Sequence, residues 1–160
     1  MKLLVLSDSH RDIQRMRYAA GQARPDAVLH LGDHIGDARE LSRHMPGIDF
    51  YMVRGNCDFQ APGQDELLLT LEGVRIYAAH GHAHGVKGGL ETIAAHGRRV
   101  EAGLVLYGHT HQASVRRARG VWLMNPGQTE RHDSIRPASY GVVTVKDGAF
   151  ECETVFLPPP

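Results

Sequence analysis

Cysteine, long apolar runs and secretion signals are scarce in this sequence. Its two cysteines, Cys57 and Cys152, are too few for a disulfide framework. The chain begins with a short apolar segment at residues 2–6 and lacks the cleavage site of a signal peptide. No apolar run approaches the roughly 20 residues that a membrane-spanning helix needs. We therefore expect a reducing, cytoplasmic setting and no membrane partner.

An excess of either charge is also missing. Lys and Arg together number 18, as do Asp and Glu, so the formal net charge at pH 7 is zero. This balance argues against a protein that binds nucleic acid mainly by neutralising phosphates over a broad surface. Arg116, Arg117 and Arg119 lie near a predicted glycine turn, where solvated surface charges are the simpler interpretation. The sequence thus carries no strong nucleic-acid signal, and it leaves a homo-oligomer open.

Histidine, in contrast, is abundant. The chain has 11 His residues against 4 Phe and 5 Tyr, and they are scattered along the sequence. Its 42% hydrophobic and 22% charged residues fit one globular domain over residues 1–160, with a Pro-rich tail at residues 157–160. Four histidines match no motif and are interpreted as structural or surface residues: His30, His44, His96 and His132. The remaining histidines make metal or acid–base chemistry worth testing.

Strand and helix patterns alternate in the first half of the chain. Apolar runs at residues 2–6, 27–31 and 50–53 are typical of buried strands. Between them, helical spacing predicts one helix that Asp12 caps and a second helix at residues 37–45. This alternation predicts a parallel sheet covered by helices. In such a sheet, sites lie beyond the carboxyl ends of the strands.

The second half is dominated by hairpin patterns. We expect a helix at residues 89–96, ended by Gly97, and then a strand at residues 104–106. Three hairpins are expected, each built from two strands around a short turn: residues 67–71 with 74–78, 113–117 with 121–124, and 140–145 with 149–155. Antiparallel strands should therefore be added to the parallel ones.

Polar side chains that bind metals follow several of the predicted strands. In Tyr107-Gly108-His109-Thr110-His111, two imidazoles at i and i+2 on extended backbone would point to the same side. The mixed oxygen and nitrogen ligands suit Mn, Fe, Ni or Zn better than Ca or Mg. Seven ligands exceed the roughly four that one zinc ion takes, so we expect two ions about 3.5–4 Å apart. The candidate ligands are Asp8, His10, Asp33, Asn56, His80, His109 and His111.

Five short motifs occur in an order that resembles the calcineurin-like metallophosphoesterase superfamily. They are Asp8-Ser9-His10, Gly32-Asp33, Gly55-Asn56-Cys57-Asp58, His80-Gly81-His82 and Gly108-His109-Thr110-His111. A later Asn125-Pro126-Gly127 is similar to that of the small YfcE-type phosphodiesterases. The resemblance extends from residue 2 to about residue 155. It implies an α/β fold, a four-layer α-β-β-α sandwich of two mixed sheets flanked by helices.

The resemblance also implies how the ligands are divided and what they do. Asp33 would bridge the two metals. One metal would be held by Asp8, His10 and His111, and the other by Asn56, His80 and His109. The implied activity is a dinuclear metal-dependent phosphodiesterase, in which a metal-bridging hydroxide attacks the phosphorus of a small phosphodiester. Manganese is the first choice of metal, with Ni, Fe or Zn as alternatives.

The acid that protonates the leaving group is the open question of this site. Larger members of the superfamily usually carry His after the Asn, whereas this chain has Cys57. A thiol can donate a proton, but Cys57 is more simply an ordinary small residue. Asp58 and His82 are the better candidates, with His34 a third. The predicted catalytic residues are therefore Asn56, Asp58 and His82.

Two other functions remain alternatives. One is a non-catalytic scaffold of the same fold that binds protein partners, like the metallophosphoesterase-like subunit of retromer. The other is a phosphomonoesterase or nucleotidase that uses the same site. The presence of every ligand residue favours an enzyme over a scaffold.

Overall fold

The first sheet contains three parallel strands extended by an antiparallel pair. The computed structural model describes residues 1–130 and 136–159, so His132 and Pro160 lie outside the described residues. The strand order is β10-β9-β1-β2-β3. The strands are β1 (Lys2–Leu6), β2 (Ala27–His30), β3 (Asp49–Met52), β9 (Ser139–Lys146) and β10 (Ala149–Phe156). The helical segments of this half are α1 (Ile13–Ala23), α2 (Ile35–Arg43) and the 3-10 turn η1 (Asn56–Asp58).

The second sheet is also five-stranded and mixed, with the order β4-β5-β6-β8-β7. Its strands are β4 (Glu66–Leu71), β5 (Val74–Ala79), β6 (Leu104–Leu106), β7 (Ser114–Ala118) and β8 (Val121–Asn125). The 3-10 turn η2 (His82–His84) and helix α3 (Glu91–Arg99) complete this half. β5, β6 and β8 run parallel, while β4 and β7 pair antiparallel at the two edges. All three predicted hairpins are confirmed.

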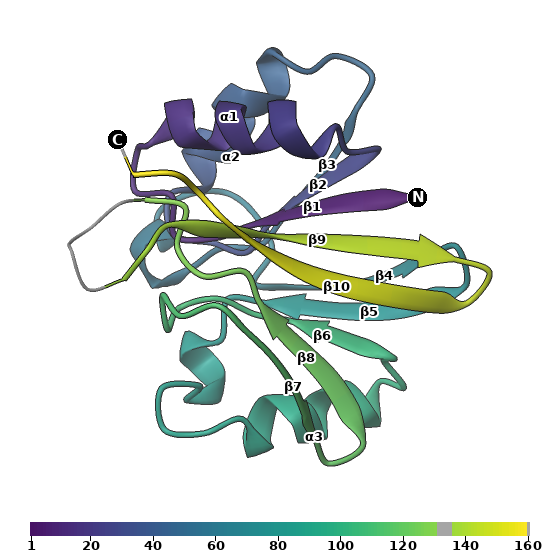
Figure 1. Cartoon of the computed structure of the whole chain (residues 1–160). Helices are drawn as coiled ribbons and strands as arrows, with labels where there is room; N and C mark the ends of the chain where they lie inside the picture. Colours follow the sequence, from purple (N-terminus) through teal and green to yellow (C-terminus); the bar gives the residue numbers. More distant parts are fainter. Residues whose placement is uncertain (131–135, 160) are drawn as a thin grey trace.

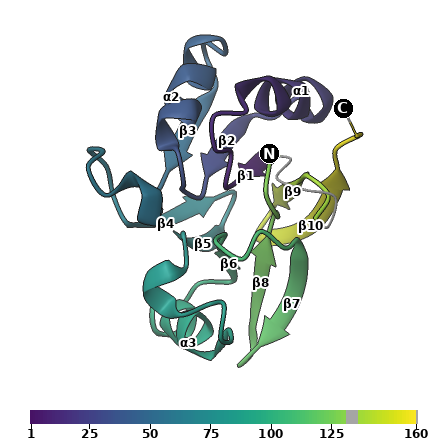
Figure 2. The ribbon, with the colours of Figure 1, turned by 90° about the vertical axis from the view of Figure 1, so that its left-hand side faces the viewer.

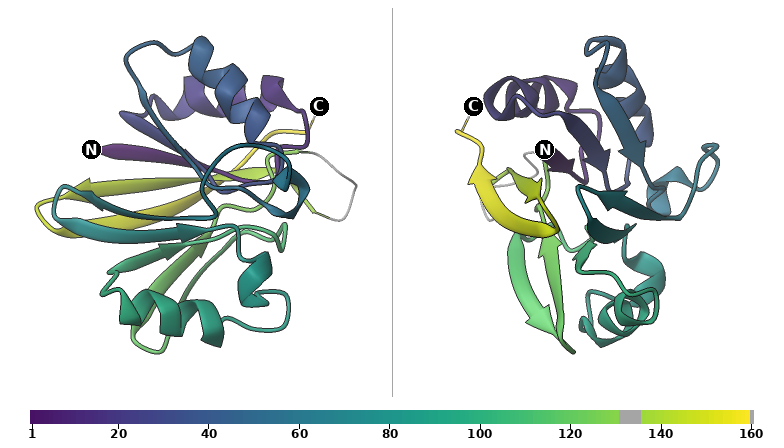
Figure 3. Two further views of the ribbon diagram at one scale, coloured as in Figure 1. Left: turned by 180° about the vertical axis from the view of Figure 1, so that it is seen from behind. Right: turned by 90° about the vertical axis from the view of Figure 1, so that its right-hand side faces the viewer.

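Figure 1 shows the four layers. Helices α1 and α2 cover the outer face of the first sheet, and α3 covers the outer face of the second. Seen from behind in Figure 3, the two sheets lie between the same helical layers. The predicted α-β-β-α sandwich of two mixed sheets is confirmed. In the part of the chain that the structure describes, none of the helices is long and apolar enough to cross a membrane.

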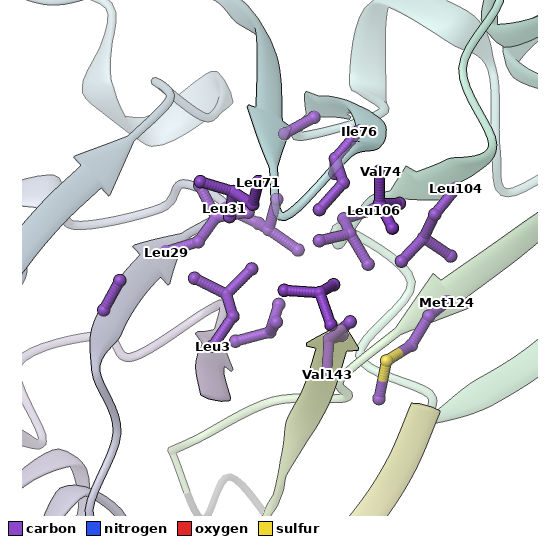
Figure 4. Close-up of a cluster of buried hydrophobic side chains, with 14 of the residues drawn as sticks. Leu3, Leu29, Leu31, Leu71, Val74, Ile76, Leu104, Leu106, Met124 and Val143 are labelled. Atoms are coloured by element: carbon purple, nitrogen blue, oxygen red, sulfur yellow. The ribbon is translucent and has the colours of Figure 1, made fainter. Parts of the chain in front are cut away.

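The core between the sheets explains why the first strand is apolar throughout. Leu3 and Val5 point toward the second sheet, where they join a cluster that includes Ile76 and Leu106. Figure 4 shows Leu3 facing these side chains of the second sheet. Residues 4 and 6 point the other way, into the cluster formed with α1 and α2. Because both faces of β1 are buried, alternation between apolar and polar residues is absent.

Both ends of α1 are closed by specific contacts. The side chain of Asp12 accepts a hydrogen bond from the backbone N–H of Arg15, as a helix N-cap does. At the other end, Arg24 adopts a left-handed conformation and its N–H donates to the carbonyl of Ala20. The predicted cap Asp12 is confirmed. Gly21 lies within the helix on its exposed side.

Several predicted boundaries need correction. Helix α2 was predicted at residues 37–45 but spans Ile35–Arg43, and α3 begins at Glu91 rather than at residue 89. Helix α3 does not end before Gly97 but continues to Arg99, because Gly97 lets the helix approach Val105 of β6 closely. A Cβ atom at position 97 would collide with the side chain of Val105. At the end of the chain, Leu157 is buried and its N–H donates to the carbonyl of Ala138. The extended tail therefore begins after Leu157, one residue later than predicted.

The same substitution at two helical glycines should have opposite effects. Gly97→Ala is expected to lower the free energy of unfolding by about 1–3 kcal/mol, because the added methyl group overpacks the contact with Val105. Gly21→Ala is the matched control, since nothing lies within 4 Å of its Cβ position. It should raise stability by about 0.5–1 kcal/mol. Urea unfolding measures both, and destabilisation by Gly21→Ala would contradict this account of α1.

Candidate metal centre

The loops that follow four strands meet at one end of the molecule. Figure 2 views this end, where β1 and β5 terminate. The loop after β1 carries Asp8 and His10, and the loop after β2 carries Asp33. His80 follows β5, and both His109 and His111 follow β6. Strand ends of both sheets thus contribute to one site, as the parallel arrangement predicts.

Four of these side chains form a first group around Asp8. Asp8, His10, Asp33 and His111 each offer one ligand atom, and these atoms all lie within 4.8 Å of one another. The Nε2 atom of His111 is 3.1 Å from Oδ1 of Asp8, and Nε2 of His10 is 4.0 Å from the same oxygen. This is a compact set of two carboxylates and two imidazoles.

A second group shares Asp33 with the first. Asp33, His80 and His109 offer ligand atoms that also lie within 4.8 Å of one another. Nε2 of His80 is 3.6 Å from Oδ1 of Asp33. The carboxylate of Asp33 is fixed by the backbone N–H of Cys57, which donates to Oδ1 at 2.9 Å. Asn56, the residue before Cys57, opens η1 with an exposed side chain.

Two histidines of these groups, His10 and His80, have unsatisfied nitrogens that fit divalent cations. Nδ1 of His80 lies 2.7 Å from the carbonyl of Leu31 and donates its proton there, which leaves the lone pair of Nε2 facing the carboxylates. Among the described residues, the buried Nε2 atoms of His10 and His80 have no hydrogen-bond partner. Buried polar atoms are normally paired. A cation between imidazole lone pairs and carboxylates would satisfy both kinds of group.

The ionisation states of Asp8 and His109 suit metal binding as well. Burial opposes ionisation of Asp8, but His111, His80 and the Ser7 hydroxyl outweigh it and lower the pKa of Asp8 to about 2. Burial lowers the pKa of His109 to about 4, and His80 adds to the effect. At neutral pH the carboxylate is therefore charged and the His109 imidazole is neutral. These are the forms in which both residues bind metals.

The backbone of these loops is left-handed rather than extended. Six site residues have positive φ angles: Asp8 at 53°, His10 at 42°, Asp33 at 59°, His34 at 70°, His109 at 68° and His111 at 60°. Such conformations cost roughly 1–2 kcal/mol each in non-glycine residues, and they concentrate at functional sites. The prediction that His109 and His111 lie on extended backbone was wrong, since both have positive φ angles after β6 ends at Leu106. The two imidazoles belong to different groups, as the family resemblance implied.

Two glycines allow the loops to come this close. A Cβ atom on Gly55 would collide with Oδ1 of Asp33, and one on Gly108 would collide with the Ser7 hydroxyl. Both positions lie within motifs that the sequence analysis identified. Their glycines are thus explained by close packing against the carboxylates rather than by an unusual φ angle.

The residues that support these loops were not predicted from the sequence. Asn125 donates from its side-chain amide to the carbonyl of Gly108 at 3.0 Å and to the Thr110 hydroxyl at 2.9 Å. It therefore holds both ends of the segment that carries His109. The only sequence signal was Asn125-Pro126-Gly127, which was noted for its resemblance and not for this contact.

A buried histidine supports the loops after β1 and β2. His30 receives the N–H of Gly32 at Nδ1, so its proton is on Nε2, which donates to the Ser9 hydroxyl 2.9 Å away. That hydroxyl donates in turn to Asp37 at 2.7 Å. Burial lowers the pKa of His30 to about 4, so the imidazole remains neutral in this chain of hydrogen bonds.

The three candidate proton donors other than Asp58 occupy different positions around the centre. His82 is exposed, and its ring centroid lies 5.4 Å from that of His80. The His34 ring lies 5.0 Å from His10. Burial, followed by the charge of Asp33, raises the pKa of the Cys57 thiol to about 11. Burial lowers the pKa of His82, with a further contribution from His80.

Asp58 has a structural task in this arrangement. Its Oδ1 accepts hydrogen bonds from the N–H groups of His34 and Ile35, and its Oδ2 accepts one from Gly55. The side chain is buried, and it satisfies free N–H groups at the start of α2. It thereby joins η1 to the loop that carries Asp33.

Known proteins resemble the chain in sequence. The calcineurin-like phosphoesterase superfamily domain matches residues 1–148. The probable metallophosphoesterase YsnB of Bacillus subtilis is 35% identical over 150 residues, which cover 93% of this chain and 87% of the relative. The phosphodiesterase YfcE of Escherichia coli is 30% identical over 102 residues, covering 57% of this chain and 50% of the relative.

Solved structures share the fold. A predicted phosphoesterase from Streptococcus pneumoniae superimposes with a TM-score of 0.79 at 27% identity, covering 97% of this chain and 88% of the other. Vps29 of Entamoeba histolytica, solved in complex with zinc, superimposes with a TM-score of 0.75 at 21% identity, covering 98% and 99% of the two chains. The family match spans the loops with both ligand groups, so the chain belongs to the calcineurin-like phosphoesterase superfamily.

Proposed function

We propose that the chain is a dinuclear metal-dependent phosphodiesterase. The observation that carries this proposal is the pair of ligand groups that share Asp33. Two divalent ions bound there would lower the pKa of water enough to provide a hydroxide nucleophile and would neutralise charge on the phosphoryl group. The name of the related YfcE supports a phosphodiester as the substrate.

In this proposal each ligand group serves one ion. Asp8, His10 and His111 hold the first, while His80 and His109 hold the second together with the amide oxygen of Asn56. Asp33 belongs to both, since its carboxylate has two oxygens and lies in both groups. The mixed nitrogen and oxygen ligands favour manganese, with nickel, iron or zinc as alternatives.

Electrostatics favours an anionic substrate. Two divalent ions bring four positive charges, and the carboxylates of Asp8 and Asp33 bring two negative ones. With neutral imidazoles, the centre keeps a positive charge that attracts a phosphate group.

Cys57 and Cys152 are both free thiols, which agrees with the proposed reducing, cytoplasmic setting.

His82 is the proposed proton donor to the leaving group. It lies beside His80 and His109, with ring centroids at 5.4 and 6.1 Å, and it lines the same pocket as Asn56. Asp58 is less suited, because both of its carboxylate oxygens already accept hydrogen bonds from backbone N–H groups. Cys57 contributes through its backbone N–H to Asp33.

The scaffold alternative has one observation in its favour. Phe59, next to η1, has 76% of its surface exposed, and Trp122 on β8 has 42% exposed. Such side chains could contact a protein partner. The alternative predicts that the ligand groups are dispensable, whereas the phosphomonoesterase alternative predicts faster hydrolysis of monoesters than of diesters. The experiments below separate these three functions.

Substitution of the second ligand group should abolish hydrolysis. The full chain is stripped with a chelator, reloaded with manganese and assayed on bis(p-nitrophenyl) phosphate and on p-nitrophenyl phosphate. We expect a higher kcat/KM for the diester, and a loss of at least about 100-fold in His109→Ala and Asn56→Ala. His44→Gln is the control, because His44 lies at the end of α2, outside both groups. Equal diester activity in all four proteins would refute the proposal.

Each histidine of the loop after β6 should affect a different ion. With two manganese ions bound, the wild type is expected to give the electron paramagnetic resonance spectrum of a coupled pair. His111→Ala should weaken the first ion and His109→Ala the second, so each should show the six-line signal of one isolated manganese ion. Crossed variants then identify the site: the ion that remains in His111→Ala should be lost when His80→Ala is added. A coupled spectrum in either single variant would rule out this assignment.

The role of His82 can be tested with leaving groups of different basicity. A proton donor matters most when the leaving group is a poor one, so His82→Gln should lower kcat for a methyl ester by roughly 100-fold or more. The p-nitrophenyl ester should be affected far less. Asp58→Asn is the comparison, and it should reduce thermal stability because its amide NH2 would face backbone N–H groups. Equal losses for both esters in His82→Gln would assign this residue to another task.

A further inference from the structure

Three metal-binding side chains meet outside the centre described above. Glu66 begins β4, His84 ends η2 and His96 lies on α3. Each offers a ligand atom, and the three atoms lie within 4.8 Å of one another. The cluster shares none of its residues with the two groups around Asp33. From the sequence alone, His96 is interpreted as a structural or surface residue, because it matches no motif.

Tyr77 holds this cluster together. Its hydroxyl donates to Oε2 of Glu66 at 2.7 Å and lies 3.1 Å from Nε2 of His84. Its ring stacks on the imidazole of His96, with centroids 4.6 Å apart and planes 27° from parallel. Burial and the carboxylate of Glu66 raise the pKa of Tyr77, so the phenol remains a donor. One buried residue of β5 therefore orients all three side chains, as the outer partners of a metal site do.

The hydrogen bonds of the cluster do not satisfy every ring nitrogen of His84 and His96. Because the Tyr77 proton goes to Glu66, Nε2–H of His84 donates to the Tyr77 oxygen and Nδ1 of His84 carries a lone pair. That Nδ1 is buried and has no hydrogen-bond partner among the described residues. Arg99 donates to Nδ1 of His96, and Nε2 of His96 is 3.8 Å from Oε2 of Glu66, too far for a hydrogen bond. The rings of His84 and His96 meet edge to face at 5.6 Å.

We propose that Glu66, His84 and His96 bind a third divalent cation of the zinc class. Two imidazoles and one carboxylate with an open fourth position form a set of ligands that zinc takes. Zinc requires ligand atoms roughly 2.0–2.2 Å from the ion, so the three side chains must move slightly closer together. They have room to do so, because the Glu66 side chain is 54% exposed and the His96 side chain 21%. Arg99 is itself at the surface and can release Nδ1 of His96.

This ion would have a structural task and would take no direct part in the proposed hydrolysis. It would join η2, α3 and the start of β4, the three segments that Tyr77 contacts through His84, His96 and Glu66. Because η2 begins with His82, the ion would also fix one wall of the pocket that contains Asn56 and His80. The cluster should therefore stabilise the second half of the chain and restrain His82.

Zinc content measures the site directly. The full-length protein is stripped of metal, dialysed to equilibrium against zinc and analysed for zinc per chain. We expect the wild type to hold one ion more than Glu66→Gln, His84→Gln or His96→Gln. The result is the difference in zinc content between the wild type and each variant. It therefore does not depend on how many ions the Asp33 centre holds, nor on whether the chain hydrolyses diesters. His44→Gln removes an imidazole that lies 3.4 Å from Glu40 and outside the cluster, and it should leave the zinc content unchanged.

Tyr77→Phe tests the positioning role. It keeps the ring that stacks on His96 but removes the hydroxyl, so zinc affinity at this site should fall by roughly 10–100-fold. Zinc should also raise the Tm of the wild type more than that of Glu66→Gln, a substitution at an exposed position that the fold tolerates. Equal zinc content in the wild type and Glu66→Gln, with equal shifts in Tm, would overturn the proposal.

Discussion

Two buried carboxylates, Asp8 and Asp33, impose the constraint on which this structure depends. A buried carboxylate is unfavourable unless hydrogen-bond donors or cations surround it. Each one here receives a backbone N–H from a distant loop: His109 donates to Asp8 and Cys57 donates to Asp33. These contacts require the loops of both sheets to meet at one end. The four-layer stack provides this meeting point, and Gly55 leaves room for it.

The layers could be predicted from the sequence because they follow from local patterns. Apolar runs of strand length, helical spacing and turn residues are all visible within about ten residues. The order of the strands was harder to predict from the sequence. β9 pairs with β1 although more than a hundred residues separate them, and neither strand carries a local signal for that partner. The prediction of where α3 ends was wrong for a similar reason. Gly97 is a helix breaker by local rules, but its contact with Val105 forms only when α3 packs against β6.

At the site, the side-chain chemistry could be predicted from the sequence, but the backbone geometry could not. The candidate ligands could be chosen from the sequence, since only a few side chain types bind metals and they recur at strand ends. The division into two groups came from a family resemblance. Positive φ angles at Asp8 and His109 could not be foreseen, because tertiary contacts impose them against local preference. Asn125 and Asp58 were missed in their supporting roles, because each acts on the backbone of a loop distant in sequence.

The segment His80-Gly81-His82-Ala83-His84 shows why the spacing of histidines does not by itself assign their roles. His80 still follows the direction of β5 and reaches the carboxylate of Asp33. Gly81 then turns the chain with a φ angle of 107°, where a Cβ atom would press on Val86. After that turn, η2 leaves His82 beside the pocket and sends His84 toward Tyr77. Three histidines at alternate positions thus face three environments. The turn at Gly81 lies in the short segment that connects His80 of the Asp33 centre to His84 of the proposed third site. A shift of η2 must therefore change the backbone at Gly81 or move His80.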